Sequence, residues 1–324
     1  MRQAALAALG TGLGVTSDAV HLSADSQDLP GRIIRFALPA SGTIVVSAVE
    51  HSSILSAADD FLARGGQVRT IGVDHQGRID IDEYRAALPG ADLAFLQTAN
   101  HEVGTRQPVD QIARACAQAD VPLVLDASTS LGHDPTPTDW SILLGQASSW
   151  GGPPGTGLLA IRDARLRRRI FREVPAAALP EVITAARGWE WVLPRVEAEA
   201  ERARHLTDQV LTAATSVPDV LLLGDPVDRL PHLVAFSCLY VDGEALVLGL
   251  DQAGFAISSG SSCVSDTRRP SHVLAAMGAL TQGNVRVSLP YGATDETVDG
   301  FAHALPGVVA QARAMLGAPV GEAP

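Results

Sequence analysis

Along residues 43–162 of this 324-residue chain, segments with a strand-like pattern of hydrophobic and polar positions alternate with segments that have a helix-like pattern. Runs of β-branched and apolar residues predict strands, and amphipathic stretches with a helical period predict the helices between them. The predicted strands are Thr43–Ala48, Gln67–Val73, Leu93–Gln97, Leu123–Leu125 and Gly157–Ile161, and the predicted helices are Ser53–Arg64, Asp82–Leu88 and Pro108–Gln118. Alternation of this kind is typical of βαβ units, so we predict a mainly parallel sheet that binds ligands at the carboxyl ends of its strands.

The pattern changes in the second half of the chain. From Gly188 to about Val217 it is continuously helical and rich in charge, which predicts a long linking helix. Beyond it we predict strands at Leu233–Tyr240, Ala256–Ser258 and Asn284–Leu289, with helices at Gly243–Gln252, Ser271–Met277 and from Asp295. We therefore expect a large α/β domain over residues 1–187, and the linking helix with a small α+β domain over residues 188–324.

Composition narrows the class of protein. A hydrophobic fraction of 46% is enough for a sizeable core, and a formal net charge of −12 argues against binding to nucleic acid. No apolar run has the length of a membrane span, and the histidines show no metal-ligand spacing, so we predict neither membrane insertion nor a metal site. The three cysteines, Cys116, Cys238 and Cys263, are too few for a disulfide framework and favour a reducing compartment, which we expect to be the cytoplasm.

Eight different short motifs are spread along the chain between residues 49 and 288. They are Val49-Glu50-His51-Ser52, Asn100-His101-Glu102-Val103-Gly104, Asp126-Ala127, Trp150-Gly151-Gly152-Pro153-Pro154-Gly155, Asp242-Gly243-Glu244-Ala245-Leu246, Ser258-Ser259-Gly260-Ser261-Ser262-Cys263, Pro270-Ser271-His272-Val273-Leu274 and Val285-Arg286-Val287-Ser288. Each is weak alone, but in this order they resemble the cysteine desulfurases, in the class V aminotransferase branch of the fold type I enzymes that use pyridoxal phosphate. This resemblance implies a fold type I architecture. The family's opening segment is missing, so we expect an N-terminally truncated large domain, and the sequence does not decide whether the true start lies upstream of Met1.

The resemblance also implies roles for individual residues. In the family a histidine like His51 stacks on the cofactor ring, an aspartate like Asp126 pairs with the ring nitrogen, and an arginine like Arg286 clamps the substrate carboxylate. Asn100 belongs to the same substrate-binding set, and His101 stands where an asparagine approaches the cofactor's phenolic oxygen. For His51 the alternative is a hydrogen-bonded histidine at a strand end, and for Asp126 it is an ordinary cap.

The residue that anchors the cofactor covalently in the family is missing. This chain contains no lysine, and Ser149 stands at the position of the lysine that forms the Schiff base, next to Ser148 in place of a histidine. A hydroxyl cannot form that bond, and the guanidinium of an arginine does not lose its proton in proteins. The sequence therefore predicts that covalent binding of pyridoxal phosphate is lost.

The stretch that corresponds to the family's phosphate-binding turn is also altered. Ser23–Gln27 has no glycine and carries Asp25, whose charge repels a phosphate dianion. Because the anchor and the turn are both altered, we expect no cofactor. The remaining vestiges of a cofactor site are then His51, His101, Asp126 and Ser148.

Three functions fit these observations. The first is a non-catalytic relative that serves as a scaffold or partner of a true desulfurase, or accepts persulfide sulfur on Cys263 in its Gly- and Ser-rich loop. The second is an active cysteine desulfurase that converts L-cysteine to L-alanine and an enzyme persulfide with an unanchored cofactor. The third is a pocket reused for another small ligand. Family members pair as dimers, so a homodimer is a further expectation from the resemblance.

Overall fold

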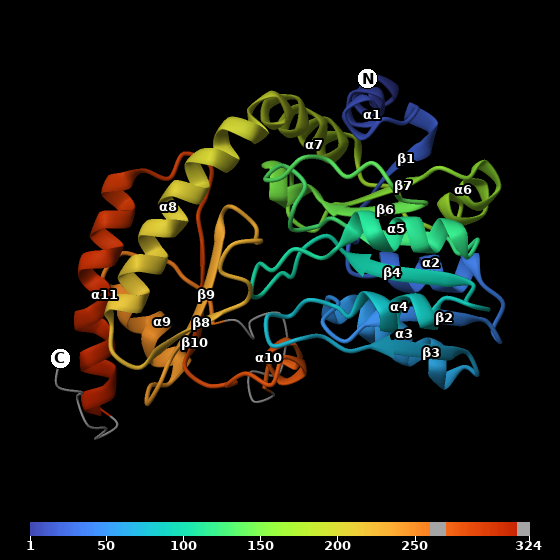
Figure 1. The fold of residues 1–324 in the computed structure, drawn as a ribbon. Coiled ribbons are helices and arrows are strands. Elements are labelled where there is room, and N and C mark those ends of the chain that lie inside the picture. The colour runs from blue at the N-terminus through green and yellow to red at the C-terminus, as the bar shows by residue number, and fades with distance from the viewer. Residues whose placement is uncertain (260–269, 316–324) are drawn as a thin grey trace. The chain divides into compact units, whose positions relative to one another are not determined.

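The computed structural model describes residues 1–259 and 270–315, and its internal contacts divide the chain into two units (Figure 1). Unit 1 consists of Met1–Val73, Arg78–Asn100 and Gln107–Glu197, and unit 2 consists of Asp74–Gly77, His101–Arg106 and Ala198–Pro324. Two short segments, residues 74–77 and 101–106, therefore belong to unit 2, although the residues before and after each of them belong to unit 1.

Unit 1 is built on a seven-stranded sheet in the order β1-β7-β6-β5-β4-β2-β3. Its strands are β1 (Val20–Ser23), β2 (Thr43–Ser47), β3 (Gln67–Ile71), β4 (Leu93–Gln97), β5 (Leu123–Asp126), β6 (Ile142–Gln146) and β7 (Gly157–Ile161). The five strands from β2 to β6 run parallel, which confirms the mainly parallel α/β sheet. Strand β7 is antiparallel to β6, because the short connection between them permits a hairpin but not a parallel crossover.

Helices cover both faces of this sheet (Figure 1). One face packs on α2 (Leu29–Ala37), α3 (Ser52–Ala63) and α6 (Ala164–Phe171). The other carries α4 (Ile81–Ala87) and α5 (Val109–Gln118), which pack against each other. The residues of β2 explain why both faces are covered. Ile44 and Val46 point into the layer of α2 and α3, while Val45 between them points to the opposite face, so both faces of the strand are apolar. Helix α1 (Arg2–Leu13) packs on α7 (Leu179–Val192).

The predicted long linking helix is interrupted. Helix α7 ends at Val192, a 3-10 turn covers Leu193–Arg195, and α8 runs over Val196–Ser216. Pro194 lies in that turn, and proline cannot donate the main-chain hydrogen bond that a continuous helix requires. A second difference concerns the predicted strand at Ala256–Ser258, which is reduced to a single bridge between Ser258 and Arg286.

Unit 2 contains an antiparallel sheet in the order β10-β9-β8. Its strands are β8 (Val220–Leu223), β9 (Leu233–Cys238) and β10 (Asn284–Ser288), and its helices are α8, α9 (Gly243–Gln252), α10 (His272–Ala276) and α11 (Asp295–Met315). Apolar side chains of α8, α9 and α11 form one core with β9 and β10. Within the described residues, none of the helices is long and apolar enough to cross a membrane.

Candidate functional site

The carboxyl ends of β2, β4 and β5 bring predicted site residues together in unit 1. Strand β4 is parallel to both β2 and β5, so the three chain segments leave the sheet at the same edge. His51 follows β2, Asn100 follows β4, and Asp126 is the last residue of β5. This edge is where ligands bind in open α/β sheets.

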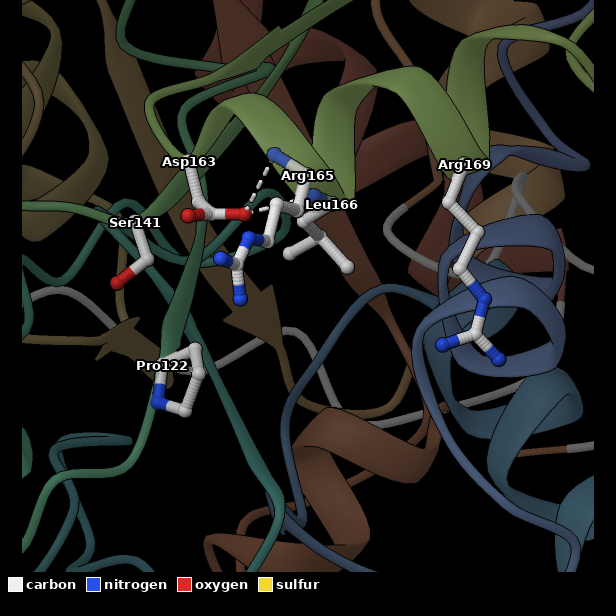
Figure 2. Close-up of a pocket in the computed structure, with 6 residues that line it drawn as sticks. All are labelled: Pro122, Ser141, Asp163, Arg165, Leu166 and Arg169. Carbon is white, nitrogen blue, oxygen red and sulfur yellow. Dashed lines mark hydrogen bonds between the residues drawn. The ribbon is translucent and has the colours of Figure 1, made fainter.

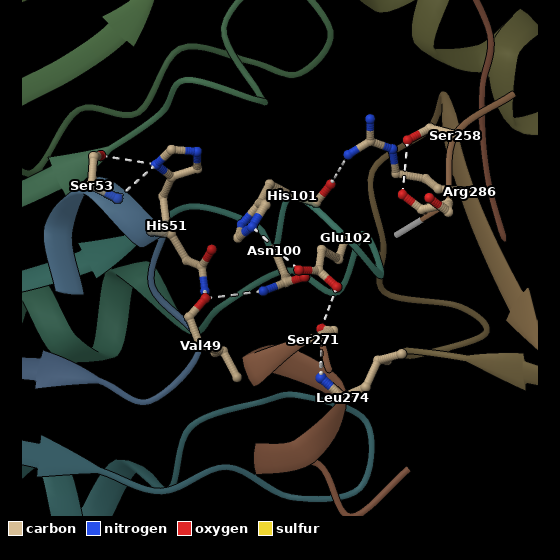
Figure 3. A network of polar contacts seen from close by, with 12 residues as sticks. Val49, His51, Ser53, Asn100, His101, Glu102, Ser258, Ser271, Leu274 and Arg286 are labelled. Atoms are coloured by element: carbon tan, nitrogen blue, oxygen red, sulfur yellow. Dashed lines mark hydrogen bonds and ion pairs between the residues drawn. The ribbon is translucent and has the colours of Figure 1, made fainter. Parts of the chain in front are cut away.

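His51 caps the N-terminus of α3 and is half-buried. Its Nδ1 accepts a hydrogen bond from the main-chain N–H of Ser53 at 3.2 Å and lies 2.8 Å from the Ser53 hydroxyl (Figure 3). Because Nδ1 acts as an acceptor, the neutral ring carries its proton on Nε2. The cap fixes the ring in one orientation, so the hydrogen-bonded and the cofactor-stacking interpretations of His51 are compatible.

Asp126 presents a carboxylate at the end of β5. It is 9% exposed, and its Oδ1 accepts the main-chain N–H of Ser128 at 2.9 Å. Its own main-chain carbonyl accepts both the N–H and the hydroxyl of Thr98, which ties β5 to the segment after β4. Among the described residues no hydrogen-bond donor contacts Oδ2. This oxygen is therefore available to a ligand that carries an N–H group.

A second carboxyl group, that of Glu50, lies in the same region and is fully buried. Its Oε1 accepts the main-chain N–H of Gln97, the residue of β4 that is in register with Asp126. Burial, and next the negative charge of Asp126, raise the pKa of Glu50 to about 8. The side-chain amides of Gln97 and Asn100 both donate to the carbonyl of Val49, at 2.7 and 3.1 Å, and hold this segment in place.

Ser149, the residue at the lysine position, lies in a 3-10 turn over Ala147–Trp150 at the end of β6. Its hydroxyl is 2.9 Å from the carbonyl of Leu131 and 2.8 Å from that of Gln146, and its single proton donates to these two acceptors. Ser148 is exposed, and its hydroxyl donates to the side chain of Gln146 at 3.4 Å. The Ser149 hydroxyl is therefore a local structural donor.

The turn before α2 already has an acceptor for each of its main-chain N–H groups. The N–H of Asp25 donates to the Ser23 hydroxyl at 3.1 Å, and that of Ser26 donates to the carbonyl of Gly155 at 3.1 Å. The N–H groups of Gln27 and Asp28 both donate to Oδ1 of Asp25, at 3.0 and 3.3 Å. A carboxylate of the chain itself thus takes the donors that a phosphate would use at this helix start.

Unit 2 holds two further predicted site residues, His101 and Arg286. Nη1 of Arg286 donates to the main-chain carbonyl of His101 at 2.9 Å (Figure 3). The side chain of Glu102 points toward Ser271, whose hydroxyl donates to Oε2 at 2.6 Å. Oε1 of Glu102 lies 3.8 Å from Nε2 of His101. Burial raises the pKa of Glu102 to about 7, although the Ser271 hydrogen bond and the Arg286 charge oppose the shift.

Reasoning from sequence assigned no role to Glu50 or Glu102, although both stand inside the motifs. The signal that was available is a glutamate next to an apolar residue within a motif, Val49 or Val103, because buried glutamates are uncommon. Cys263 lies outside the described residues. The other two cysteines, Cys116 and Cys238, are buried, and burial raises their pKa to about 12 and about 11.

A hollow of about 460 Å³ opens at the opposite edge of the sheet, near the amino ends of β5 and β6 (Figure 2). It is lined by Pro122, Ser141, Asp163, Arg165, Leu166 and Arg169. Oδ1 of Asp163 accepts the N–H groups of Arg165 and Leu166, so the chain itself satisfies these donors at the start of α6. The hollow is remote from Asp126, because it lies at the other end of the strands.

Comparisons with known proteins agree with this arrangement. Residues 30–169 and 176–301 match the family described as aminotransferase class-V. A cysteine desulfurase of Cereibacter sphaeroides is 34% identical over 293 residues, which cover 86% of this chain and 75% of that protein. One of Azotobacter chroococcum mcd 1 is 33% identical over 317 residues, covering 94% and 77%. The solved structure of a NifS-like protein superposes with a TM-score of 0.85 at 21% identity, covering 95% of this chain and 87% of that chain.

The expectation that the chain takes no cofactor was wrong. The family match over most of the chain and the cysteine desulfurase relatives make pyridoxal phosphate the expected cofactor. The missing lysine removes only the covalent bond to the cofactor. In the family, a different residue contacts the nitrogen of the cofactor ring. Asp126 fits that contact, because one of its carboxylate oxygens accepts no hydrogen bond within the described part of the chain.

Both the resemblance seen in the motifs and the fold type I architecture are confirmed. The family match extends from α2 into α11, so it includes elements of both units. The chain therefore belongs to the class V aminotransferase family, and it is similar along most of its length to cysteine desulfurases.

Proposed function

We propose that this chain is a desulfurase-like protein that holds pyridoxal phosphate without a covalent bond and depends on another desulfurase for its sulfur. The observation that carries the proposal is Ser149, whose hydroxyl donates to two main-chain carbonyls in a chain without any lysine. When bound, the cofactor supplies an electron-withdrawing ring. No amine of this chain lies at that position to move protons in the subsequent steps.

The cofactor contacts that we propose come from unit 1. Oδ2 of Asp126 would accept a hydrogen bond from the protonated ring nitrogen, and His51, whose ring is fixed by Ser53, would stack on the ring. At the phosphate end, Asp25 competes for the N–H groups of Gln27 and Asp28. We therefore expect binding that is reversible and weaker than covalent attachment.

The substrate contact that we propose comes from unit 2. A guanidinium offers parallel donors that match a carboxylate, and one nitrogen of Arg286 is already fixed on the carbonyl of His101. Within the described residues Nε of Arg286 is buried without a hydrogen-bond partner. Arg286 is thus held in position with a donor to spare for the carboxylate of an α-amino acid.

We assign the sulfur-carrying role to Cys263. Its thiolate attacks the terminal sulfur of a donor protein's persulfide, the donor's thiolate leaves, and the sulfur is transferred without a further oxidant or reductant. Cys116 and Cys238 are unsuited to this reaction, since burial disfavours their thiolate forms.

One observation favours a second candidate, an active desulfurase with an unanchored cofactor. The chain keeps acceptable residues for the ring nitrogen and for the substrate carboxylate, namely Asp126 and Arg286. This candidate and the proposal differ in one result, which is the formation of L-alanine from L-cysteine by the purified chain alone.

The cofactor is tested by incubating the chain with pyridoxal phosphate, followed by borohydride reduction and peptide mass spectrometry. The wild-type chain should carry no internal label, and dialysis should remove the cofactor. At stoichiometric cofactor, Ser149→Lys should gain a label at that residue, whereas Thr215→Lys, at an exposed position of α8, serves as a control and should not. Formation of L-alanine by the wild-type chain at a rate typical of enzymes would overturn the proposal in favour of the second candidate.

The sulfur role is tested by mixing the chain with an active desulfurase and L-cysteine, followed by mapping of persulfides. Cys263 should be labelled, and Cys263→Ser should lose the label. Cys116→Ser and Cys238→Ser are controls that should keep it. Equal labelling of all three cysteines, or of none, would contradict the sulfur role.

A further inference from the structure

Unit 2 places a buried acid next to the arginine that we propose to bind the substrate carboxylate. Glu102 is 3% exposed, and the residue before it, His101, accepts a hydrogen bond from Arg286 through its main-chain carbonyl. The positive charge of Arg286 lowers the pKa of the Glu102 carboxyl, against the larger effect of burial. The charge on Glu102 and the charge on Arg286 are therefore coupled.

A hydrogen bond fixes the orientation of the Glu102 carboxyl group. The Ser271 hydroxyl accepts the N–H of Leu274 at 3.1 Å, so its own proton donates to Oε2 of Glu102 at 2.6 Å. The other carboxyl oxygen, Oε1, lies 3.8 Å from Nε2 of His101. The hydrogen bond from Ser271 holds the carboxyl group in place and favours its ionised form.

We propose that Glu102 is a positioning residue that sets, through its charge, the affinity of Arg286 for the carboxylate of an α-amino acid. This inference rests on the proposed function of Arg286. An ionised Glu102 attracts the guanidinium and repels an incoming carboxylate, whereas a neutral Glu102 does neither. Among the described residues of unit 2, its titratable or charged neighbours are Arg286, His101 and, with its ring 6.3 Å from that of His101, His272.

The test is calorimetric titration of the full chain, without added cofactor, with L-alanine at pH 6 and pH 8. L-Alanine is a zwitterion at both values, so a change in affinity reports the protein. The wild-type chain should bind on the order of tenfold more weakly at pH 8, as expected for one new charge close to a partly buried site. Glu102→Gln should bind equally at both pH values. Glu244→Gln, an exposed glutamate of α9, should keep the wild-type difference.

Ser271→Ala supplies an independent variant. Its hydroxyl stabilises the ionised form of Glu102, so its removal should move the midpoint of the affinity change to higher pH. Identical pH profiles for the wild-type chain and either variant would overturn the role of Glu102 and leave the carboxylate site standing. If the wild-type chain binds no L-alanine, or if Arg286→Ala binds it equally well, the carboxylate site itself fails, and the role of Glu102 fails with it.

Discussion

Replacing Glu50 by glutamine is expected to make unit 1 less sensitive to pH. Glutamine keeps the size of the side chain and can still accept the N–H of Gln97, but it has no proton to lose. In the wild-type chain burial, and next the charge of Asp126, raise the pKa of Glu50 from 4.5 to about 8. The folded state therefore holds a proton that the unfolded chain releases above pH 4.5.

The size of the effect follows from proton linkage. A raised pKa in an acid means that stability is fully present below pH 4.5 and is lost as the pH rises toward the folded value of about 8. Each pH unit in this window lowers the free energy of unfolding by about 1.4 kcal/mol. Between pH 5 and pH 7 the wild-type chain should therefore lose about 3 kcal/mol that Glu50→Gln does not lose.

Urea denaturation followed by tryptophan fluorescence is the appropriate assay. The four tryptophans, Trp140, Trp150, Trp189 and Trp191, all belong to unit 1, as does Glu50. Glu173→Gln, at an exposed glutamate of unit 1, is the matched control and should keep the wild-type slope. A constant difference in stability between the wild-type chain and Glu50→Gln from pH 5 to pH 7 would refute the reasoning.

Three further predictions concern other sites. Asp25→Asn should strengthen binding of pyridoxal phosphate severalfold but leave binding of pyridoxal unchanged in equilibrium dialysis, because only the phosphate competes with this carboxylate. Tyr84→Phe removes a buried hydroxyl that donates to the carbonyl of Phe95 at 2.8 Å, so urea denaturation should show a loss of about 1–2 kcal/mol. Gly283→Ala should destabilise unit 2 by more than about 2 kcal/mol, measured by circular dichroism, because φ is +67° and a methyl group would clash with the carbonyl of Cys238. A neutral result at Gly283 would show that the turn shifts at little cost.

Several elements were predictable because their patterns are local. The continuous apolar run Leu93–Gln97 was predicted as a buried strand and forms β4 over the same residues. The helix after Pro108 begins and ends within one residue of its predicted bounds. The prediction of one continuous linking helix was wrong, because the charge pattern continues through Pro194 while the helical main-chain hydrogen bonds do not.

Elements that depend on pairing with distant residues were harder to predict. Residues 256–258 have an extended pattern, but only Ser258 bridges to Arg286, so no strand forms there. The direction of β7 depends on the length of its connection to β6 rather than on its apolar residues. In the site, the resemblance implied that His51 and Asp126 contact one cofactor, while the parallel pairing of β2, β4 and β5 shows that both follow the same edge of the sheet.

The sequence by itself determined that no lysine of this chain can bind the cofactor covalently. The chain contains no lysine and so offers no side-chain amine, wherever its residues lie. It also determined the family, through motifs whose order does not depend on folding. Only the tertiary structure decided which carboxyl groups hold protons near neutral pH. Glu50 and Glu102 are ordinary glutamates in the unfolded chain, and their pKa values rise because segments distant in sequence exclude water from them. The charge of Asp126 adds to the rise at Glu50, whereas the charge of Arg286 opposes it at Glu102.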